Sequence, residues 1–202
     1  MSAALLRRWT STVQSEVSVV EISRAPVSGA DVPQILREIA PELRDCSMVI
    51  LAVDSARPVD VSAASETAKS LHIGAHVCLA IDSASLAHFQ HGDMRCNDQV
   101  GLLLDHVNAN TPLSHVMQQG IEAIRFDQAF AREAMAHLPS GCILEAILSL
   151  AKNAGLCTLG PDVGPSSDDV SVATFDYVPE HGYESATKAL TDVGRGTERS
   201  SR

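Results

Sequence analysis

Short apolar segments alternate with helical patterns through most of the chain, and this alternation restricts the fold more than any other feature of the sequence. The strand candidates are residues 17–22, 48–53, 76–81, 101–104, 121–126, 156–159 and, with the weakest pattern, 170–175. Helical patterns between such strands are typical of parallel βα units. We therefore predict an α/β fold: a trimmed TIM-type (β/α) barrel of about seven strands. The pattern does not decide whether this barrel closes completely.

Two helices can be placed from their residue patterns. In the first, Asp31 can cap the start, Pro33 falls in the first turn, and Pro41 ends or kinks the helix. Its predicted buried residues are Ile35, Leu36, Ile39 and Leu43. The second covers residues 140–155 and stops at Gly155. Its predicted buried residues are Ile143, Leu144, Ile147, Leu148 and Ala151.

The composition limits the partners of the chain. A formal net charge of -10 at pH 7 disfavours binding of a nucleic acid polymer, because phosphate recognition needs clustered lysine and arginine. The longest apolar run, residues 48–53, is far shorter than the roughly 20 residues of a membrane-spanning helix. The five cysteines form no CxxC pair and favour reduced core thiols. We therefore expect a cytoplasmic protein with no membrane segment.

A single domain accounts for the length of the chain. With 202 residues, of which 45% are hydrophobic, the chain can bury one substantial core. We predict one domain over residues 1–193, beginning with a helix at residues 1–15. The polar sequence GRGTERSSR, residues 194–202, predicts a flexible C-terminal tail.

Acidic residues recur at the ends of the apolar segments: Glu21, Asp54, Asp82, Asp105 and Asp127. In a closed parallel barrel the C-terminal strand ends meet at one mouth, so these carboxylates would gather there. Oxygen ligands of this kind suit a hard divalent cation. An aspartate after a strand is also a common helix cap or turn former. The pattern leaves both interpretations open.

The segment LLLDHVNANTPLSHVMQQGIEAIRFDQAF, residues 102–130, resembles part of the EAL domain, the cyclic di-GMP phosphodiesterase family. That part usually reads LDDFGTGYSSLSYL, followed by a strand like KIDRSF. AILSLAKNAGLCTLGPDVG, residues 146–164, resembles the family's AIIALAHALGLKVVAEGVE. The similarity is best over residues 100–164. Upstream, VVEISRA resembles the EALLR signature, with Glu21 as its glutamate and Arg24 near its arginine, and AVDSAR resembles NLSAR.

The sequence departs from the family at several positions that matter for catalysis. An active EAL enzyme resembles a two-metal hydrolase whose Glu, Asn and Asp side chains hold the cations. The resemblance places Val53 near the asparagine and Ala80 near a glutamate, and neither can ligate a metal. It also places His106, Arg125 and Pro161 at the positions of an aspartate, the lysine and a further glutamate. We therefore predict no bound metal, no cofactor and no catalytic residue.

The resemblance then implies a catalytically inactive EAL-like domain that acts as a regulatory binding module in bacterial signalling. Of the two outcomes, enzyme or non-enzyme, the sequence favours the non-enzyme. Its partners would be another protein, a second copy in a homodimer, or cyclic di-GMP. The candidate ligand-binding residues are Glu21, Arg24, Asp82, Asp105, His106, Arg125 and Asp127. Two alternatives remain: an active phosphodiesterase that uses Mg or Mn with unusual ligands, and a small barrel enzyme of unknown chemistry.

Overall fold

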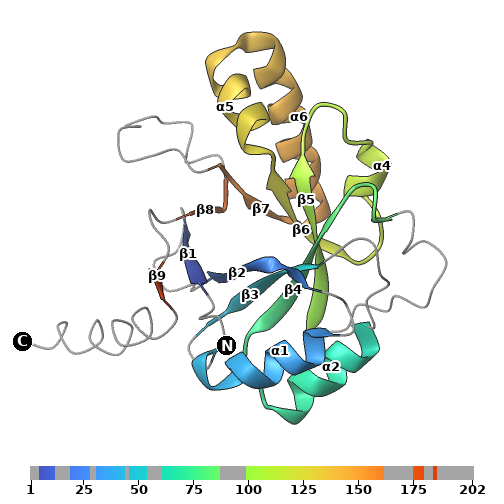
Figure 1. The fold of residues 1–202 in the computed structure, drawn as a ribbon. Coiled ribbons are helices and arrows are strands. Elements are labelled where there is room, and N and C mark those ends of the chain that lie inside the picture. The colour runs from blue at the N-terminus through green and yellow to red at the C-terminus, as the bar shows by residue number, and fades with distance from the viewer. Residues whose placement is uncertain are drawn as a thin grey trace, which may run out of the picture.

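The structure is a computed structural model that describes residues 5–11, 19–27, 31–43, 46–53, 61–86, 99–161, 175–179 and 184–185 (Figure 1). Its main feature is a sheet of nine strands, eight of which close into a ring in the order β2-β3-β4-β5-β6-β7-β8-β1, with β1 returning to β2. The strands of the ring are β1 (Leu5–Ser11), β2 (Val19–Val27), β3 (Met48–Val53), β4 (His76–Asp82), β5 (Val100–Val107), β6 (Ile121–Phe126), β7 (Cys157–Leu159) and β8 (Tyr177–Pro179).

Strand direction follows one rule with one exception. The strands from β2 to β8 pair in parallel, whereas β1 is antiparallel to both of its neighbours in the ring, β2 and β8. The two-residue strand β9 (Glu184–Ser185) also pairs with β1. The predicted α/β barrel is therefore confirmed, and it is a closed ring in which β1 supplies the strand that the sequence pattern did not reveal.

The N-terminal segment corrects a prediction. Leu5–Ser11 is a β-strand and lies within the region, residues 1–15, that we expected to be helical. Trp9 points into the barrel and is 3% exposed, and Arg7 lies two residues before it. Aromatic and β-branched residues fit a pleated surface, and pairing with β2 and β8 outweighs any local helical preference of this short segment.

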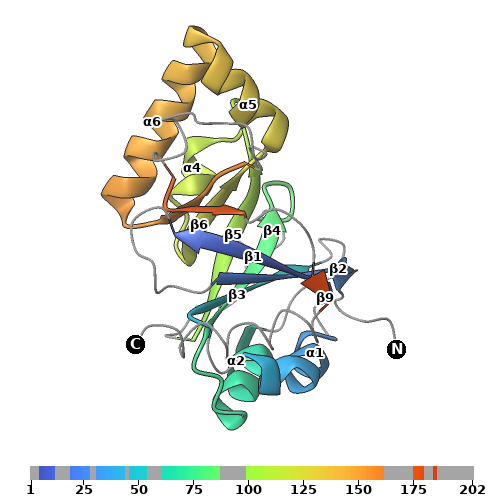
Figure 2. The ribbon, with the colours of Figure 1, turned by 90° about the vertical axis from the view of Figure 1, so that its left-hand side faces the viewer.

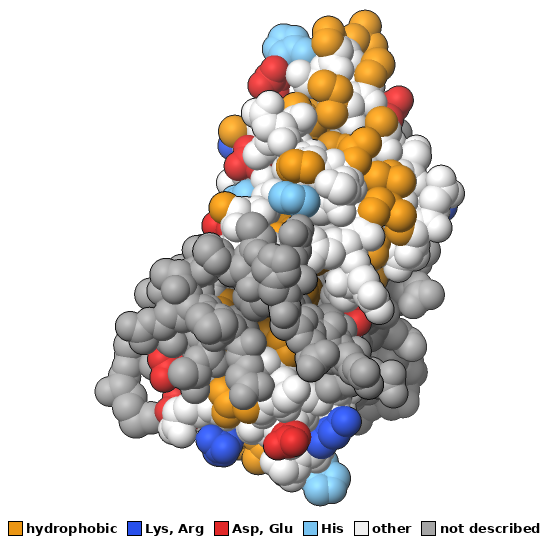
Figure 3. Space-filling model, turned by 90° about the vertical axis from the view of Figure 1, so that its right-hand side faces the viewer, with side chains coloured by type: hydrophobic (Ala, Val, Ile, Leu, Met, Phe, Trp, Pro, Cys, Tyr) orange, Lys and Arg blue, Asp and Glu red, His pale blue; other side chains and the backbone are white. Residues whose placement is uncertain are grey.

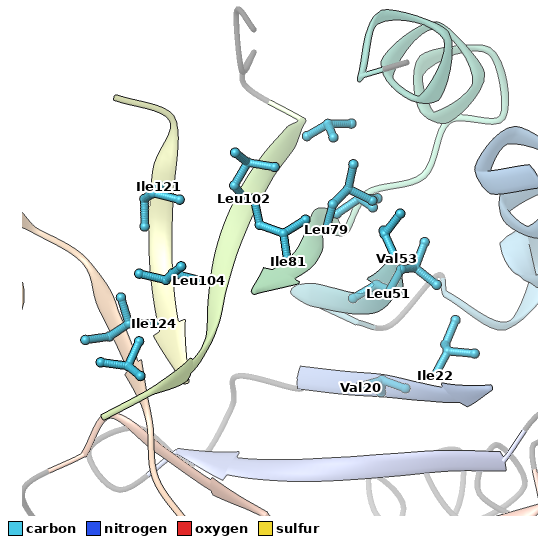
Figure 4. Close-up of a cluster of buried hydrophobic side chains, with 14 of the residues drawn as sticks. Val20, Ile22, Leu51, Val53, Leu79, Ile81, Leu102, Leu104, Ile121 and Ile124 are labelled. Atoms are coloured by element: carbon cyan, nitrogen blue, oxygen red, sulfur yellow. The ribbon is translucent and has the colours of Figure 1, made fainter. Parts of the chain in front are cut away.

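Side chains alternate between two apolar layers. Ile50, Cys78, Ala80, Leu103 and Ala123 belong to a cluster in the interior of the barrel. The alternate residues of the same strands belong to a larger cluster that also contains the buried faces of the helices. Figure 4 shows these outward side chains extending from the strands toward the helices. The period of two in the strands therefore decides which residues reach the barrel interior.

Helices cover the outside of the ring in two groups (Figures 1 and 2). One group is α1 (Val32–Ile39), the 3₁₀ turn η2 (Ala40–Glu42) and α2 (Val61–Ser70). The other is α5 (Gln128–Ala136) and α6 (Leu138–Ala154), and the short α4 (Leu113–Val116) precedes β6. Within the described residues no single helix is long and apolar enough to cross a membrane, and the α5–α6 pair reaches that length only with a bend of 119°.

The two helices expected from the sequence are present, with two differences. Three of the predicted core residues are buried in α1, and the fourth, Leu43, is buried directly after the 3₁₀ turn that contains Pro41. The Asp31 side chain, however, accepts no capping hydrogen bond. In α6, Gly155 takes the left-handed conformation at the C-terminus, with φ of 72°. Ile143 is 42% exposed rather than buried, because it lies on the side of α6 that faces away from the barrel.

The strand boundaries agree with the predictions in the middle of the chain. β3 and β6 cover the predicted residues 48–53 and 121–126, and β4, β5 and β7 differ by a few residues at their ends. β2 begins later than predicted and is longer. Of the weak candidate at residues 170–175, residues 170–174 lie outside the described part of the chain, and Phe175 precedes the strand β8.

Candidate functional site

The candidate site lies inside the barrel at the C-terminal ends of the parallel strands. Glu21 on β2, Asp105 on β5 and Arg125 on β6 each come two residues after an interior residue of the same strand. The period of two in the strands therefore points all three side chains into the barrel. We call Glu21, Asp105 and Arg125 the mouth triad.

Arg125 contacts both carboxylates of the mouth triad. Its Nε donates to Asp105 Oδ1 at 2.7 Å, and its Nη2 donates to Asp105 Oδ2 at 2.5 Å. Its Nη1 donates to Oε1 of Glu21. The contact with Asp105 is thus bidentate, the geometry in which a planar guanidinium and a carboxylate interact most strongly. Since β6 and β2 lie on opposite sides of the eight-stranded ring, Arg125 connects the two sides of the barrel.

Burial makes these contacts stronger than those of a surface ion pair. The side chains of Arg125 and Asp105 are 16% and 9% exposed, and that of Glu21 is 12% exposed. Burial opposes ionisation of Asp105, but hydrogen bonds from Arg125 and its charge, with smaller contributions from His106, outweigh it and lower the pKa of Asp105. Burial likewise opposes the charge of Arg125, but Asp105 and then Glu21 raise the pKa of the guanidinium. Asp105 and Arg125 are therefore both charged at neutral pH.

His106 lies at the rim of the mouth. Its backbone has a φ of 55°, which is uncommon for a residue other than glycine, and its N–H donates to Asp105 Oδ1 at 2.8 Å. The imidazole is 69% exposed, with Nε2 3.8 Å from Asp105 Oδ2 and Nδ1 4.0 Å from Asp127 Oδ2. A protonated His106 would thus add a positive charge between two carboxylates.

The remaining predicted residues either cap a turn or a helix or lie outside the part of the chain that the structure describes. Asp127 caps α5 by accepting the N–H of Phe130 at 2.9 Å. Asp82 accepts the N–H of Ser85 at 2.7 Å, and the Ser85 hydroxyl as well. Both carboxylates therefore serve as turn and helix caps, the other interpretation that the sequence left open. The side chain of Arg24 and the whole of Asp54 lie outside the described residues.

Two inward residues of β1, Arg7 and Trp9, were missed because the first strand was expected to be a helix. Arg7 on β1 lies directly opposite Glu21 on β2, so their side chains share one face of the sheet. The guanidinium carbon of Arg7 lies 5.7 Å from the centre of the Trp9 ring, within the range of a cation–π contact. The inward alternation of Arg7 and Trp9 is the signal that could have identified this strand.

A second polar cluster lies at the opposite end of the barrel, where β4, β5 and β6 begin. His76 Nε2 lies 2.5 Å from Glu122 Oε2. Gly101 makes room for this carboxylate, because a Cβ there would lie 2.3 Å from Glu122 Oε2. Burial, followed by the charges of Asp176 and Glu122, raises the pKa of the nearby Cys157 thiol. None of these residues was among the candidate site residues predicted from the sequence.

Three positions at which the resemblance would put an asparagine or a glutamate carry apolar residues here: Val53, Ala80 and Pro161. Ala80 belongs to the apolar interior cluster, and Pro161 is buried. Val53 packs in the outer cluster, and its neighbour Ala52, which pairs with Ala80, has no ligating atom either. Within the described residues, no three or more His, Cys, Asp or Glu side chains are placed to hold a metal ion.

A two-metal centre does not fit the mouth triad. The inward carboxylates of Glu21 and Asp105 already accept hydrogen bonds from Arg125. A divalent cation about 4 Å from that guanidinium would be repelled by roughly 8 kcal/mol at an effective dielectric constant of about 20. Arg125 and a divalent cation would therefore compete for the same two carboxylates.

A closed α/β barrel with one antiparallel strand and charged residues at its C-terminal mouth defines the class of fold. The sequence matches no protein-family model and no curated protein. The fold, however, is that of an EAL-like domain. It is similar to the FimX EAL domain from Pseudomonas aeruginosa bound to c-di-GMP, with a TM-score of 0.71, 12% identity, and coverage of 91% of this chain and 90% of that chain.

Two further solved structures support the same fold. The EAL domain of Mycobacterium smegmatis DcpA has a TM-score of 0.66 and 14% identity, with coverage of 96% of this chain and 97% of that chain. The phosphodiesterase PaMucR in complex with c-di-GMP has a TM-score of 0.65 and 11% identity, with coverage of 93% and 99%. At these identities the likeness establishes the fold, and the predicted EAL-like domain is confirmed at that level.

Proposed function

We propose that this chain is an EAL-like regulatory domain that binds cyclic di-GMP and does not hydrolyse it. The observation that carries this proposal is the mouth triad, in which Arg125 occupies both inward carboxylates that would otherwise be available to a metal ion. A two-metal phosphodiesterase needs those oxygens to position its cations and its attacking water. We place the domain in cytoplasmic bacterial signalling as part of the same proposal.

Binding of the nucleotide is supported by the fold and by local charge. Two of the solved structures that this chain resembles, the FimX EAL domain and the phosphodiesterase PaMucR, contain bound c-di-GMP. Although the net charge of the chain is -10, Arg7 and Arg125 place two guanidinium groups inside or beside the mouth. Cationic side chains of this kind can offset the repulsion between an acidic protein and a dianionic ligand.

A turnover assay separates this proposal from an active phosphodiesterase. The purified protein is incubated with cyclic di-GMP and Mg²⁺ or Mn²⁺, and the linear dinucleotide is sought by chromatography. We expect no product. Product that disappears in an Asp105→Asn variant would instead establish the metal-dependent alternative, with Glu21 and Asp105 released from Arg125. Product that persists in that variant would point to a contaminating activity.

Calorimetry tests binding directly. Titration of cyclic di-GMP in the presence of a chelator is expected to show one site per chain, because the proposal requires no metal for binding. The matched control is an Arg37→Met variant, which removes an exposed arginine of α1 on the outside of the barrel and should bind equally well. No binding at high micromolar concentration would leave protein interaction as the function, or the third alternative, a small barrel enzyme of unknown chemistry.

Protein interaction is favoured independently by the outer face of α6. Leu138 and Ile143 are 86% and 42% exposed, and Cys142 and Ala146 on the same face are also exposed. Figure 3 shows apolar side chains along the upper part of the molecule, where α5 and α6 lie. The exposed residues of α6 are mainly apolar in its N-terminal half, over residues 138–146, and a helix that is hydrophobic all round is usually buried. We infer that a second protein surface covers this face.

We propose a second copy of the same chain as the partner of this face. The exposed apolar residues gather in the N-terminal half of α6, at residues 138–146. A two-fold axis near Ile143 would bring this half of each copy against the same half of the other and bury both Ile143 side chains. We expect light scattering after gel filtration to give a dimer mass, which falls to that of a monomer in Ile143→Glu. Ser62→Glu on α2 is the control, and a monomeric unmodified protein would contradict the dimer.

A further inference from the structure

We propose that Arg125 is the permanent cation of the barrel mouth: its guanidinium holds the place that a divalent cation would take between Glu21 and Asp105, and its removal opens a divalent cation site there. This proposal deepens the proposed function. It rests on that function only where it explains why cyclic di-GMP would bind without a metal ion. Its own test, however, measures cation binding and stability and does not depend on the nucleotide.

The contacts define how completely Arg125 fills this role. Three of its N–H groups point to three carboxylate oxygens, one on Glu21 and two on Asp105. These carboxylates come from β2 and β5, and Arg125 comes from β6, so a single positive group joins three strands of the ring. A metal ion at the same place would join the same strands through the same oxygens.

The guanidinium is suited to remain at this position. Its side chain is 16% exposed, and arginine keeps its charge at every pH at which the protein is folded. The planar fork matches the Asp105 carboxylate, which also accepts the backbone N–H of His106 at 2.8 Å. An internal cation of this kind cannot dissociate or be removed by a chelator, whereas a bound metal ion can.

Among the described residues, the rest of the mouth offers no second place for a cation. Ala80 and Ala52 supply methyl groups at the level where the family has ligating side chains, and Asp82 is held by Ser85. Asp127 caps α5. In the described part of the mouth, the oxygens that could attract a divalent cation are therefore those held by Arg125, and the proposal concerns that one place.

The test compares the unmodified protein with Arg125→Met, Arg125→Met combined with Asp105→Asn, and Arg37→Met as a control that removes an exposed arginine elsewhere. Free Mn²⁺ is measured by electron paramagnetic resonance during titration, and thermal unfolding is followed with and without Mn²⁺ or a chelator. Mn²⁺ is used because oxygen ligands suit it and its free ion gives a direct signal.

We expect the unmodified protein and Arg37→Met to bind no stoichiometric Mn²⁺ and to keep the same Tm in Mn²⁺ and in chelator. We expect Arg125→Met to bind about one Mn²⁺ per chain and to gain several degrees in Tm from it, because ligand bound to the folded state stabilises that state. The combined variant should lose this response, since it lacks one of the two carboxylates.

Two results would overturn the proposal. One is stoichiometric Mn²⁺ binding by the unmodified protein, because Arg125 would then not exclude the cation. The other is a folded Arg125→Met variant that shows no response to Mn²⁺. If Arg125→Met does not fold without added cation, its rescue by Mn²⁺ supports the proposal and the absence of rescue opposes it. If the expected Mn²⁺ results are obtained but the unmodified protein binds no cyclic di-GMP, only the proposed function is rejected.

Discussion

At the scale of single residues, the mouth triad combines charge and burial in a way that makes the stability of the protein depend on pH. Asp105 has a pKa below its ordinary value of 3.8, because the contacts with Arg125 outweigh the burial that opposes ionisation. A carboxyl whose pKa is lower in the folded state stabilises that state above its unfolded pKa, and the contribution is lost as the pH falls through the folded value. The triad therefore stabilises the barrel at neutral pH and weakens in acid.

This pH dependence gives a prediction for Asp105→Asn. At neutral pH the variant should be less stable by about 3–5 kcal/mol, because Arg125 loses one partner of a buried pair. As the pH falls below about 3.8 the difference should shrink, because the unfolded chain then binds a proton at Asp105 that the folded state, with its lower pKa, does not yet bind. Urea denaturation at several pH values, followed by the fluorescence of the single tryptophan, measures both effects. An equal loss of stability at every pH would contradict the role assigned to Asp105.

Gly160 is a second residue with a specific role in packing. A Cβ at this position would lie 2.7 Å from Cδ2 of Phe175, which is 1% exposed and stacks edge-to-face on Phe126 at 5.5 Å between ring centres. We predict that Gly160→Ala lowers the free energy of unfolding by about 1–3 kcal/mol, the usual cost of overpacking. Gly74→Ala is the control, because no atom lies within 4 Å of its added Cβ. A similar effect of both substitutions in urea denaturation would reject the packing explanation.

At the scale of helices and strands, the sequence predicts those elements whose residues carry their own pattern. β3 is a continuous apolar run, β6 is mainly apolar between Gly120 and Asp127, and α6 has both an apolar stripe and a glycine stop. Their bounds are therefore close to those predicted. The prediction that Ile143 is buried was wrong, because an apolar residue on the outer face of a helix is indistinguishable in sequence from one on the inner face. Periodicity places an element but does not choose between two apolar faces.

β1 was not predicted, because its local pattern is short and two of its three partner strands are distant in sequence. It pairs with β2, which follows it closely, and with β8 and β9 near the other end of the described chain. The same limit applies to the mouth triad. The sequence identified Glu21, Asp105 and Arg125 separately, but the hydrogen bonds among them depend on the register of three strands and on closure of the ring. Such contacts follow from topology and not from local pattern.

The role of β1 can be tested at Trp9. The indole N–H of Trp9 is buried, and no acceptor for it is found in the described structure, so the ring contributes through its apolar surface. We predict that Trp9→Phe changes the free energy of unfolding by less than about 1 kcal/mol, because loss of contact is offset by removal of an unsatisfied donor. Trp9→Ala should cost about 3–5 kcal/mol. Chemical denaturation followed by circular dichroism compares them, and equal losses would show that the indole donor has a partner.

At the scale of the whole molecule, closure of the ring joins the two ends of the described chain. β1 lies between β2 on one side and β8 and β9 on the other, so the first strand is held by residues from both halves of the sequence. The parallel strands from β2 to β8 alone would form an open sheet with two edges. Since the interior cluster contains Trp9 and Leu159 together, the core is complete only when the ring is closed.

This coupling predicts how the chain responds to truncation. Removal of residues 175–202 deletes β8 and β9, leaves β1 paired only with β2, and removes Phe175 from the core. We expect loss of a single cooperative thermal transition, with the fluorescence of Trp9 shifted toward that of exposed tryptophan. Removal of residues 194–202 alone, the tail predicted from its polar sequence, should leave the Tm unchanged. Separate transitions of Trp9 fluorescence and circular dichroism in the full chain would instead mean that residues 1–193 do not form one cooperative domain.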